Sequence, residues 1–399
     1  MDFFDFVRPH EHEEQMRRDL IERVQNAVRR TGGGDARNVD ILCFGSFAAG
    51  LYLPTADMDL VAVSRPFMSY GQKTFCQKSH KMHQLMAHLV RCGIAQEGTT
   101  SVVAKAKVPI IKFTDKTTGI KVDISFENDS GLMANRTFDE WKRQYPAMPV
   151  LVVLVKQILA MRDLNEVFTG GLGGFSIICL VVSMLELSPA CAPTRLGSQQ
   201  RYSDLLLNFL DLYGNQLDVR TTGIIMRPPS YFDKIRQPMR SQNNKNLTIV
   251  DPNNPNNDIS GGSREIYAVF EVFRHAHAQI MQRMSRIHSG KDSYGSMLGD
   301  VLGGNYSSFI RQRDRLYKLS IGQDVGPAPI AQSAQRTTAP RRQQRKQVKP
   351  DAVDAVDADN RPRKRLRSSE GNQNDPSARE GYSGFLTPSR GWQALRTHD

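Results

Sequence analysis

The chain has 399 residues, of which 39% are hydrophobic, and it carries a formal net charge of +12. This length accommodates two domains and a tail, and the basic balance favours a polyanionic partner. The five cysteines form no Cys-x-x-Cys pair, which excludes a zinc ribbon or a disulfide scaffold and fits a reducing compartment. We expect no membrane span, because the longest apolar run, residues 175–187, is short and is interrupted by serines and a glutamate.

The first predicted element is an amphipathic helix over residues 11–30. Leu20, Val24 and Val28 recur at helical spacing, and the three glycines that follow end the helix. We expect residues 1–34 to pack on a helical central domain that forms later in the chain.

Residues 41–63 predict two strands that are joined by a turn and a short helix. The turn Gly45-Ser46 offers backbone N–H groups and a hydroxyl that suit a phosphate. Asp57 and Asp59 open the second strand on one face, because strand side chains alternate. Two such carboxylates raise each other's pKa unless a cation lies between them, and a hard divalent cation such as Mg²⁺ suits oxygen ligands.

An isolated Asp-x-Asp is most often a cap or a solvated turn, so this pair alone does not establish a metal site. After a helix predicted over residues 75–92, residues 101–126 have the pattern of two strands that are joined by a turn over 114–119. The second strand carries Asp123 between apolar neighbours. We expect this hairpin to place Asp123 beside the earlier pair, so that three carboxylates converge on one site.

From residue 148 the pattern becomes helical. Residues 151–164 form an apolar helix that encloses Lys156, whose ammonium requires an anion unless it reaches solvent at an edge. The glycine-rich turn 170–174 opens a buried helix over 177–187. Such a turn before a helix is a weak indication of a phosphate site.

The following stretch lacks a clear pattern. Between helices predicted over residues 202–213 and 264–287, residues 214–246 are predicted to be irregular. The density of proline and asparagine in residues 247–259 disfavours a helix or a strand and indicates a loop or a linker. A strand-like entry over residues 247–250 and the helix that follows favour the ordered loop.

The last part of the chain is predicted to be a disordered basic tail over residues 320–399, because aromatic residues are rare and no periodicity survives. The basic runs 340–349 and 361–367 are typical of nuclear localisation or nucleic-acid contact, although a solvated charge run is the alternative.

The order of strand, Gly-Ser, Asp-x-Asp and a later third aspartate resembles the DNA polymerase β-like nucleotidyltransferase superfamily. Four strings narrow the resemblance to the nuclear noncanonical poly(A) polymerases: VPIIKF (108–113), VDISFEN (122–128), LVKQILAMRDLNEVFTGGLGGFS (154–176) and DPNNPNND (251–258). These enzymes are the topoisomerase-related-function family, the catalytic subunits of TRAMP-type RNA-surveillance complexes. The resemblance covers roughly residues 1–310.

The resemblance implies an α+β fold. A nucleotidyltransferase palm domain, a mixed sheet with helices, would span residues 35–145. A mostly helical poly(A) polymerase-associated domain would span residues 146–319. The nucleotide and the RNA 3′ end would meet in the cleft between the two domains.

The resemblance also implies a role for each of several residues. Asp57 and Asp59 would bind both metal ions, and Asp123 would complete the ion that activates the RNA 3′-hydroxyl for in-line attack on the α-phosphate. The ions would be Mg²⁺, with Mn²⁺ as a substitute. Gly45 and Ser46 would hold the triphosphate.

Four further positions match the family's nucleotide contacts. Lys156 would contact the triphosphate, Asn135 the ribose, and the ring of Phe175 would stack on the base. Asn257 would face the base edge. Because relatives that add uridine often carry histidine there, and an amide can both donate to and accept from adenine, Asn257 favours ATP.

The implied activity is template-independent addition of AMP to RNA 3′ ends in the nucleus, the nucleolus included, which would mark transcripts for exosome-linked decay or processing. No RRM or KH motif is found in the sequence, so the resemblance implies reliance on a zinc-knuckle RNA-binding subunit and an RNA helicase. Two alternatives stay open. A terminal uridylyltransferase is disfavoured by Asn257, and a scaffold with little activity is disfavoured by the intact acidic triad.

Overall fold

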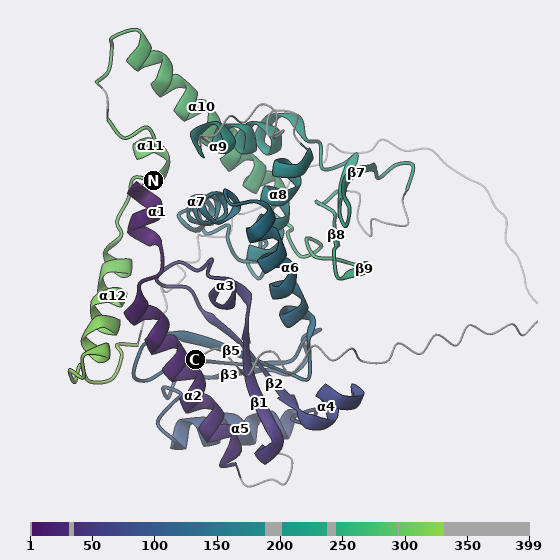
Figure 1. Ribbon diagram of the computed structural model, residues 1–399, viewed down its shortest axis with the longest axis vertical. Coiled ribbons are helices and arrows are strands. Elements are labelled where there is room, and N and C mark those ends of the chain that lie inside the picture. The colour runs from purple at the N-terminus through teal and green to yellow at the C-terminus, as the bar shows by residue number, and fades with distance from the viewer. Residues whose placement is uncertain (1, 32–35, 188–201, 238–244, 294, 331–399) are drawn as a thin grey trace, which may run out of the picture. The chain divides into compact units, whose positions relative to one another are not determined.

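The structure is a computed structural model that describes residues 2–31, 36–187, 202–237, 245–293 and 295–330 (Figure 1). These residues lie in one compact unit, and they form two β-sheets and two large apolar cores. A mixed sheet with helices and a mostly helical part are both present, which confirms the predicted α+β fold class.

The first sheet of the described residues has five strands in the order β1-β2-β5-β4-β3. Their bounds are β1 (Val39–Phe44), β2 (Met58–Ser64), β3 (Ser101–Val103), β4 (Ile110–Thr114) and β5 (Lys121–Phe126). Strand β2 pairs antiparallel with β1 and parallel with β5. The predicted hairpin is confirmed for β4 and β5, which pair antiparallel, but its first strand is interrupted at residues 104–109. Residues 104–107 alternate alanine and lysine, which are both weak strand formers, and Pro109 follows them.

Helix α2 (Glu11–Arg29) packs on this sheet and against α12 (Ser307–Ser320), so within residues 146–319 it contacts the last described helix rather than the main apolar core. Its apolar residues Leu20, Val24 and Val28 share a core with β1 and with α5 (Ser79–Arg91). The spacing of the stripe predicted the helix correctly but carried no information about which apolar surface would cover it. Only the preceding α1 (Asp2–Val7) contacts the helical part, at α7.

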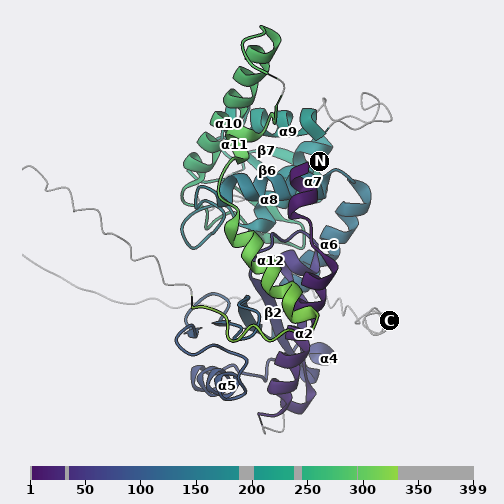
Figure 2. The same ribbon diagram turned by 90° about the vertical axis from the view of Figure 1, so that its left-hand side faces the viewer.

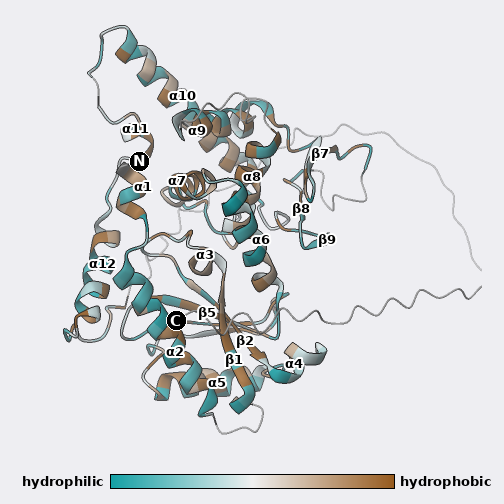
Figure 3. Ribbon diagram, in the orientation of Figure 1, coloured by the Kyte–Doolittle hydropathy of each residue, from teal (hydrophilic) through white to brown (hydrophobic). Residues whose placement is uncertain are grey.

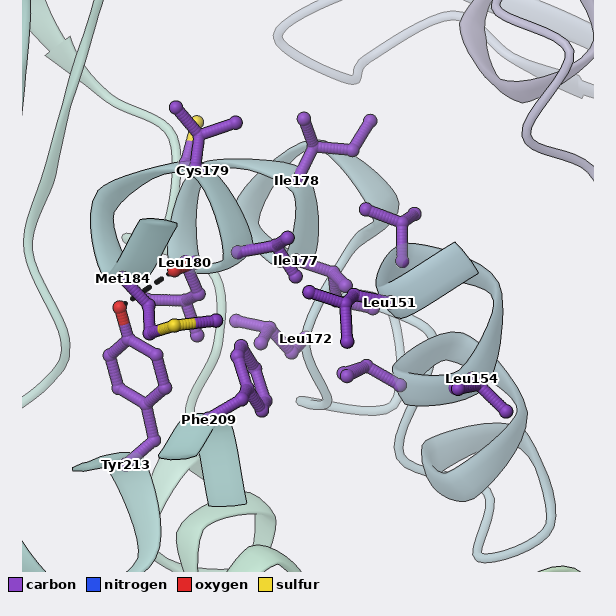
Figure 4. Packing of buried hydrophobic residues seen from close by; sticks show 14 of the residues in the cluster. Leu151, Leu154, Leu172, Ile177, Ile178, Cys179, Leu180, Met184, Phe209 and Tyr213 are labelled. Atoms are coloured by element: carbon purple, nitrogen blue, oxygen red, sulfur yellow. Dashed lines mark hydrogen bonds between the residues drawn. The ribbon is translucent and has the colours of Figure 1, made fainter. Parts of the chain in front are cut away.

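The helical part is organised around two apolar helices, α7 (Met148–Ala160) and α8 (Gly174–Leu187). Their surfaces are hydrophobic on nearly all sides, as the brown ribbon in Figure 3 shows, because other helices surround them. The covering helices are α6 (Ser130–Gln144), α9 (Tyr202–Asp211), α10 (Ile266–His288) and α11 (Gly299–Leu302). In Figure 4 the Tyr213 hydroxyl donates to the Leu180 carbonyl oxygen at 2.8 Å, beside Phe209 and Ile177.

A second sheet, in the order β7-β6-β8-β9, occupies the stretch that was predicted to be irregular. Its strands are β6 (Thr222–Met226), β7 (Pro229–Asp233), β8 (Ile249–Asp251) and β9 (Asn254–Asp258). The prediction of a loop over residues 247–259 was therefore wrong. Pro255 is tolerated because β9 is an edge strand, and the β8–β9 pairing is irregular at Val250 and Asp251.

The C-terminal helix α12 (Ser307–Ser320) packs against α2, as Figure 2 shows from the side, rather than within the helical domain. Residues 321–330 are ordered, contrary to the prediction of a tail from residue 320. Ala328 is buried, and its N–H donates to the Lys116 carbonyl oxygen at 2.8 Å. The basic runs 340–349 and 361–367 lie outside the described residues. Within the described part, none of the helices is both long and apolar enough to cross a membrane.

Candidate active site

The acidic triad lies on two neighbouring strands. In the parallel pairing of β2 with β5, Asp59 is directly opposite Asp123. Asp57 and Asp59 flank the buried Met58, so both carboxylates point away from the core. The structure therefore confirms that the hairpin brings Asp123 beside the earlier pair.

Two of the three carboxylates, those of Asp57 and Asp59, have raised pKa values. Burial, and then the charges of Asp123 and Asp57, raise the pKa of Asp59 to about 7. Burial also raises the pKa of Asp57, with a further contribution from Asp123, and the nearby Lys121 opposes it. Such a site gains stability from any cation that lies between the oxygens.

Lysines partly balance this charge. Lys112 lies opposite Asp123 in the β4–β5 register and donates to its Oδ2 atom, and Lys121 Nζ lies 4.0 Å from Asp57 Oδ1. With these contacts in place, the described residues contain no cluster of three His, Cys, Asp or Glu side chains arranged to hold a metal ion. The sequence argument missed Lys112, although it occupies the same face of the predicted hairpin as Asp123.

Lys156 reaches the site from α7. It donates from Nζ to the Leu51 carbonyl oxygen at 2.8 Å. Burial lowers the pKa of Lys156 to about 8, and the charges of Asp59 and Glu166 oppose that shift. The half-buried lysine therefore lies near Asp59 of the acidic triad.

The turn at Gly45 lies in contact with the triad. Gly45 begins the short helix α3 (Gly45–Ala48) with a left-handed φ of +74°, and a Cβ atom there would lie 2.3 Å from Asp59 Oδ2. The N–H of Gly45 donates to Asn135 Oδ1 at 3.0 Å. Asn135 is on α6, so this helix links the turn to the helical part. Ser46, the next residue, is half-buried.

Phe175 and Asn257 lie on the helical part. Phe175, in the first turn of α8, is half-buried and packs edge-to-face on Phe138 with ring centroids 5.0 Å apart. Its neighbour Gly174 is close to the Lys156 ammonium, since a Cβ there would lie 3.6 Å from Nζ. Asn257, on β9, hydrogen-bonds to Asp251 and to Lys107 rather than to the triad.

Arg17 supports the site from α2 and was not found from the sequence. The side chain is fully buried, with its guanidinium 4.6 Å from the ring centroid of Tyr52. It donates to the carbonyl oxygens of Pro54 and Ala56, at 3.3 Å and 3.1 Å, and so holds the segment that leads into Asp57. The sequence feature that could have identified Arg17 as a buried residue is its position three residues before Leu20, which places it within the apolar stripe of the helix.

Two family models match the chain. "Poly(A) RNA polymerase, mitochondrial-like, central palm domain" matches residues 1–143, and "Cid1 family poly A polymerase" matches residues 201–257. Poly(A) RNA polymerase protein 2 of Saccharomyces cerevisiae is 36% identical over 75% of this chain and 50% of its own length. The chain spans about half the length of the first curated relatives that it matches.

Solved structures agree with the family models. The polymerase core of TRAMP, an RNA surveillance complex, has a TM-score of 0.66 and 33% identity, covering 76% of this chain and 92% of that chain. The Cid1 poly(U) polymerase has a TM-score of 0.58 at 17% identity, covering 76% of this chain and 97% of that chain, and so shares the fold.

Proposed function

Because the chain belongs to the noncanonical poly(A) RNA polymerase family of nucleotidyltransferases, we propose that it adds AMP from ATP to RNA 3′ ends without a template. The observation that carries the proposal is the acidic triad on adjacent parallel strands, with the Gly45 turn packed against one of its members. A scaffold would have no use for three carboxylates placed together on neighbouring strands, because like charges at short range repel.

The triad is the proposed metal site. Its donor atoms are carboxylate oxygens, which are the ligands that Mg²⁺ and Mn²⁺ prefer, and the strand register places Asp59 directly opposite Asp123. Asp57 and Asp59 would hold both ions and Asp123 one of them. Two bound ions would lower the pKa of the RNA 3′-hydroxyl and stabilise the charge on the leaving pyrophosphate.

The surrounding residues would orient the nucleotide. Lys156 supplies a half-buried positive charge near Asp59, which suits a triphosphate. The turn at Gly45 and Ser46 would receive the phosphates, since only glycine leaves room for Asp59 there. Asn135, which accepts the Gly45 N–H, would contact the ribose next to this turn.

Base recognition would involve Phe175 and Asn257. The ring of Phe175 is held by its edge-to-face contact with Phe138, which leaves it pre-oriented for stacking on a base. The Asn257 amide retains one unused N–H and one unused lone pair, which match the donor and acceptor of an adenine edge. We therefore favour ATP over UTP.

The proposed setting is nuclear RNA surveillance, the nucleolus included. The most similar solved structure given above is the core of a surveillance complex. We propose that a zinc-knuckle RNA-binding subunit and an RNA helicase act with this chain, and that the basic runs in residues 331–399 contribute contacts to RNA.

Primer extension tests this function. Purified protein, a short labelled RNA and Mg²⁺ would be incubated with each of the four nucleoside triphosphates in turn, beside an Asp57→Ala/Asp59→Ala control. We expect extension with ATP that is lost in the control and restored by neither Mg²⁺ nor Mn²⁺. Preference for UTP would instead assign a uridylyltransferase, and no extension even with a zinc-knuckle partner would assign a scaffold.

A further inference from the structure

Asn257 is held between two charged side chains. Lys107 Nζ donates to Asn257 Oδ1 at 3.2 Å, and Asn257 Nδ2 donates to Asp251 Oδ2 at 3.0 Å. An ammonium can only donate and a carboxylate can only accept, so these two partners admit one orientation of the amide. If the amide turned over, it would place N–H against N–H and oxygen against oxygen.

The two partners come from different parts of the molecule. Asp251 belongs to the same hairpin as Asn257, at the end of β8. Lys107 belongs to residues 104–109, the segment between β3 and β4 of the catalytic sheet. The orientation of the Asn257 amide is therefore set partly by the sheet that carries the acidic triad.

A second connection supports the same hairpin at its turn. Thr137 Oγ1, on α6, hydrogen-bonds to Asn253 Oδ1 at 2.9 Å, and the Asn253 N–H donates to Asp251 Oδ1 at 2.8 Å. Two residues earlier on α6, Asn135 accepts the N–H of Gly45. The carboxylate of Asp251 thus accepts from Asn253 on one oxygen and from Asn257 on the other, so it links the contact with α6 to the contact with Lys107.

We propose that Lys107 is a positioning residue for base selection, which fixes the Asn257 amide so that its free N–H and its free lone pair face an adenine edge in one arrangement only. This inference rests on the proposed role of Asn257 in choosing ATP. Lys107 acts through Asn257 and touches neither the phosphates nor the metal ligands. Without Lys107 only the Asp251 carboxylate would hold the amide, so Asn257 Oδ1 would lose the partner that fixes its position and the flipped arrangement, with donor and acceptor exchanged, would be less strongly disfavoured.

A general phosphate contact is the competing role for an exposed lysine on a basic loop. That role would change the KM for RNA, or the KM for all nucleotides equally, because phosphates are common to them. A positioning role would change only the ratio of kcat/KM values between ATP and UTP. The two roles are therefore separated by kinetics.

The test compares Lys107→Met with Lys107→Arg, which keeps a donor at this position, and with Lys105→Met. Lys105 is the matched control because it is exposed on the same loop, two residues earlier. Steady-state extension of one RNA primer with ATP and with UTP would give kcat and KM for each variant. We expect Lys107→Met to lower the ATP/UTP ratio about threefold to tenfold, the size of one hydrogen bond, with the KM for RNA unchanged. Lys107→Arg should retain the ratio, and Lys105→Met should leave it unaltered.

Asn257→Ala and the double variant Lys107→Met/Asn257→Ala complete a double-mutant cycle, which measures whether the two side chains act together. If Lys107 acts through Asn257, the double variant has the same ATP/UTP ratio as Asn257→Ala. An equal loss with both nucleotides, or a raised KM for RNA at constant ratio, overturns the inference and leaves the proposed function intact. An unchanged ratio in Asn257→Ala overturns base selection by Asn257 and the inference with it, whereas AMP addition by the wild type would still stand.

Discussion

At the scale of single residues, the site depends on a contact that only glycine allows. Gly45 combines a left-handed φ with a close approach to Asp59, so a methyl group there meets a carboxylate oxygen. The nearby Gly50 has a similar φ of +66°, yet a Cβ there would have nothing within 4 Å. Substitutions at the two glycines should therefore cause similar backbone strain, but only a substitution at Gly45 should also displace Asp59.

We predict that Gly45→Ala lowers kcat for primer extension about 100-fold, because it displaces Asp59, a proposed metal ligand, by about an ångström or more. Gly50→Ala should carry the same conformational penalty, about 1 kcal/mol in the free energy of unfolding, and keep activity within about threefold. Thermal unfolding of both variants would be measured beside activity. Equal loss of activity in the two variants would contradict the steric explanation.

A second residue-scale prediction concerns pH. Glu127 is fully buried at the end of β5, where it accepts the Ser64 N–H at 2.9 Å. Burial raises the pKa of Glu127 above its usual value of 4.5, and the hydrogen bonds from Ser64 oppose that shift. The folded protein thus binds the proton more tightly than the unfolded chain does, so this group's contribution to stability declines as pH rises from about 4.5 through the folded-state pKa.

Glu127→Gln removes this titration. We expect the melting temperature of Glu127→Gln minus that of the wild type to rise by about 1 to 3 °C between pH 4.5 and pH 7.5. Differential scanning fluorimetry at several pH values measures this difference in melting temperature. A loss of the hydrogen bonds to Ser64 would shift the difference by the same amount at every pH. A difference that is independent of pH would show that Glu127 does not titrate in this range.

At the scale of elements, the attachment of α2 to the catalytic sheet is the main organising contact. Arg23 makes a bidentate pair with the fully buried Asp115, with both N–O distances 2.9 Å, and Asp115 also accepts from the Thr118 N–H and hydroxyl. The pair joins α2 to the turn between β4 and β5, which is the hairpin that carries Asp123.

We predict that Asp115→Asn lowers the free energy of unfolding by about 3 kcal/mol, because it leaves the Arg23 guanidinium without its charged partner. Asp40→Asn is the matched control, since Asp40 pairs with Arg29 of the same helix at 2.9 Å but both side chains are about half exposed. That pair should contribute less than about 1 kcal/mol. Urea unfolding of both variants gives the comparison, and equal effects would refute the importance of burial.

At the scale of the whole molecule, the segment after α12 closes over the catalytic sheet. The Ala328 carbonyl oxygen accepts from Gln96 Nε2 at 2.7 Å, and the side chain lies close enough to Gly119 that an added methyl there would be 3.1 Å away. Residues that were predicted to belong to a disordered tail thus contribute to the packing of the sheet.

We predict that Ala328→Asp in the full chain destabilises the protein by about 3 kcal/mol, because it buries an unpaired carboxylate. Ile330→Asp, two residues later and 56% exposed, should change the free energy of unfolding by less than about 0.5 kcal/mol. The midpoints of thermal unfolding of the two variants measure this. Equal melting temperatures would mean that the segment does not pack on the sheet in solution.

The parts of the fold that could be predicted were those fixed by local pattern. The alternation around Asp57 and Asp59 was sufficient to predict two carboxylates on one face, because strand geometry sets which face each residue takes, whereas Asp123 was singled out by the family resemblance. The spacing of Leu20 and Val24 likewise predicted α2, but not its partner.

The parts that could not be predicted depend on contacts between distant segments. Strand β9 was missed because Pro255 and its asparagines disfavour a strand, and only its place at a sheet edge makes them acceptable. Arg17 was missed because it acquires its partners from residues 54–56, which the sequence does not place beside α2. Lys112 was overlooked although the predicted hairpin already put it on the same face as Asp123. The roles of Asn135, Phe175 and Asn257 remain predictions, as do those of Gly45, Ser46, Lys156 and the acidic triad.

The pairing of α2 with α12 has a consequence for how the protein is made. Glu13 has a fully buried side chain, and Arg313 Nε, 300 residues later, donates to its Oε2 atom at 3.2 Å. During synthesis α2 therefore leaves the ribosome before α12 exists, and the surface of α2 that packs on α12 stays exposed until almost all of the described chain has been translated. A product that stops before residue 307 would expose this surface and the Glu13 carboxylate together, which makes incomplete chains recognisable to chaperones and proteases.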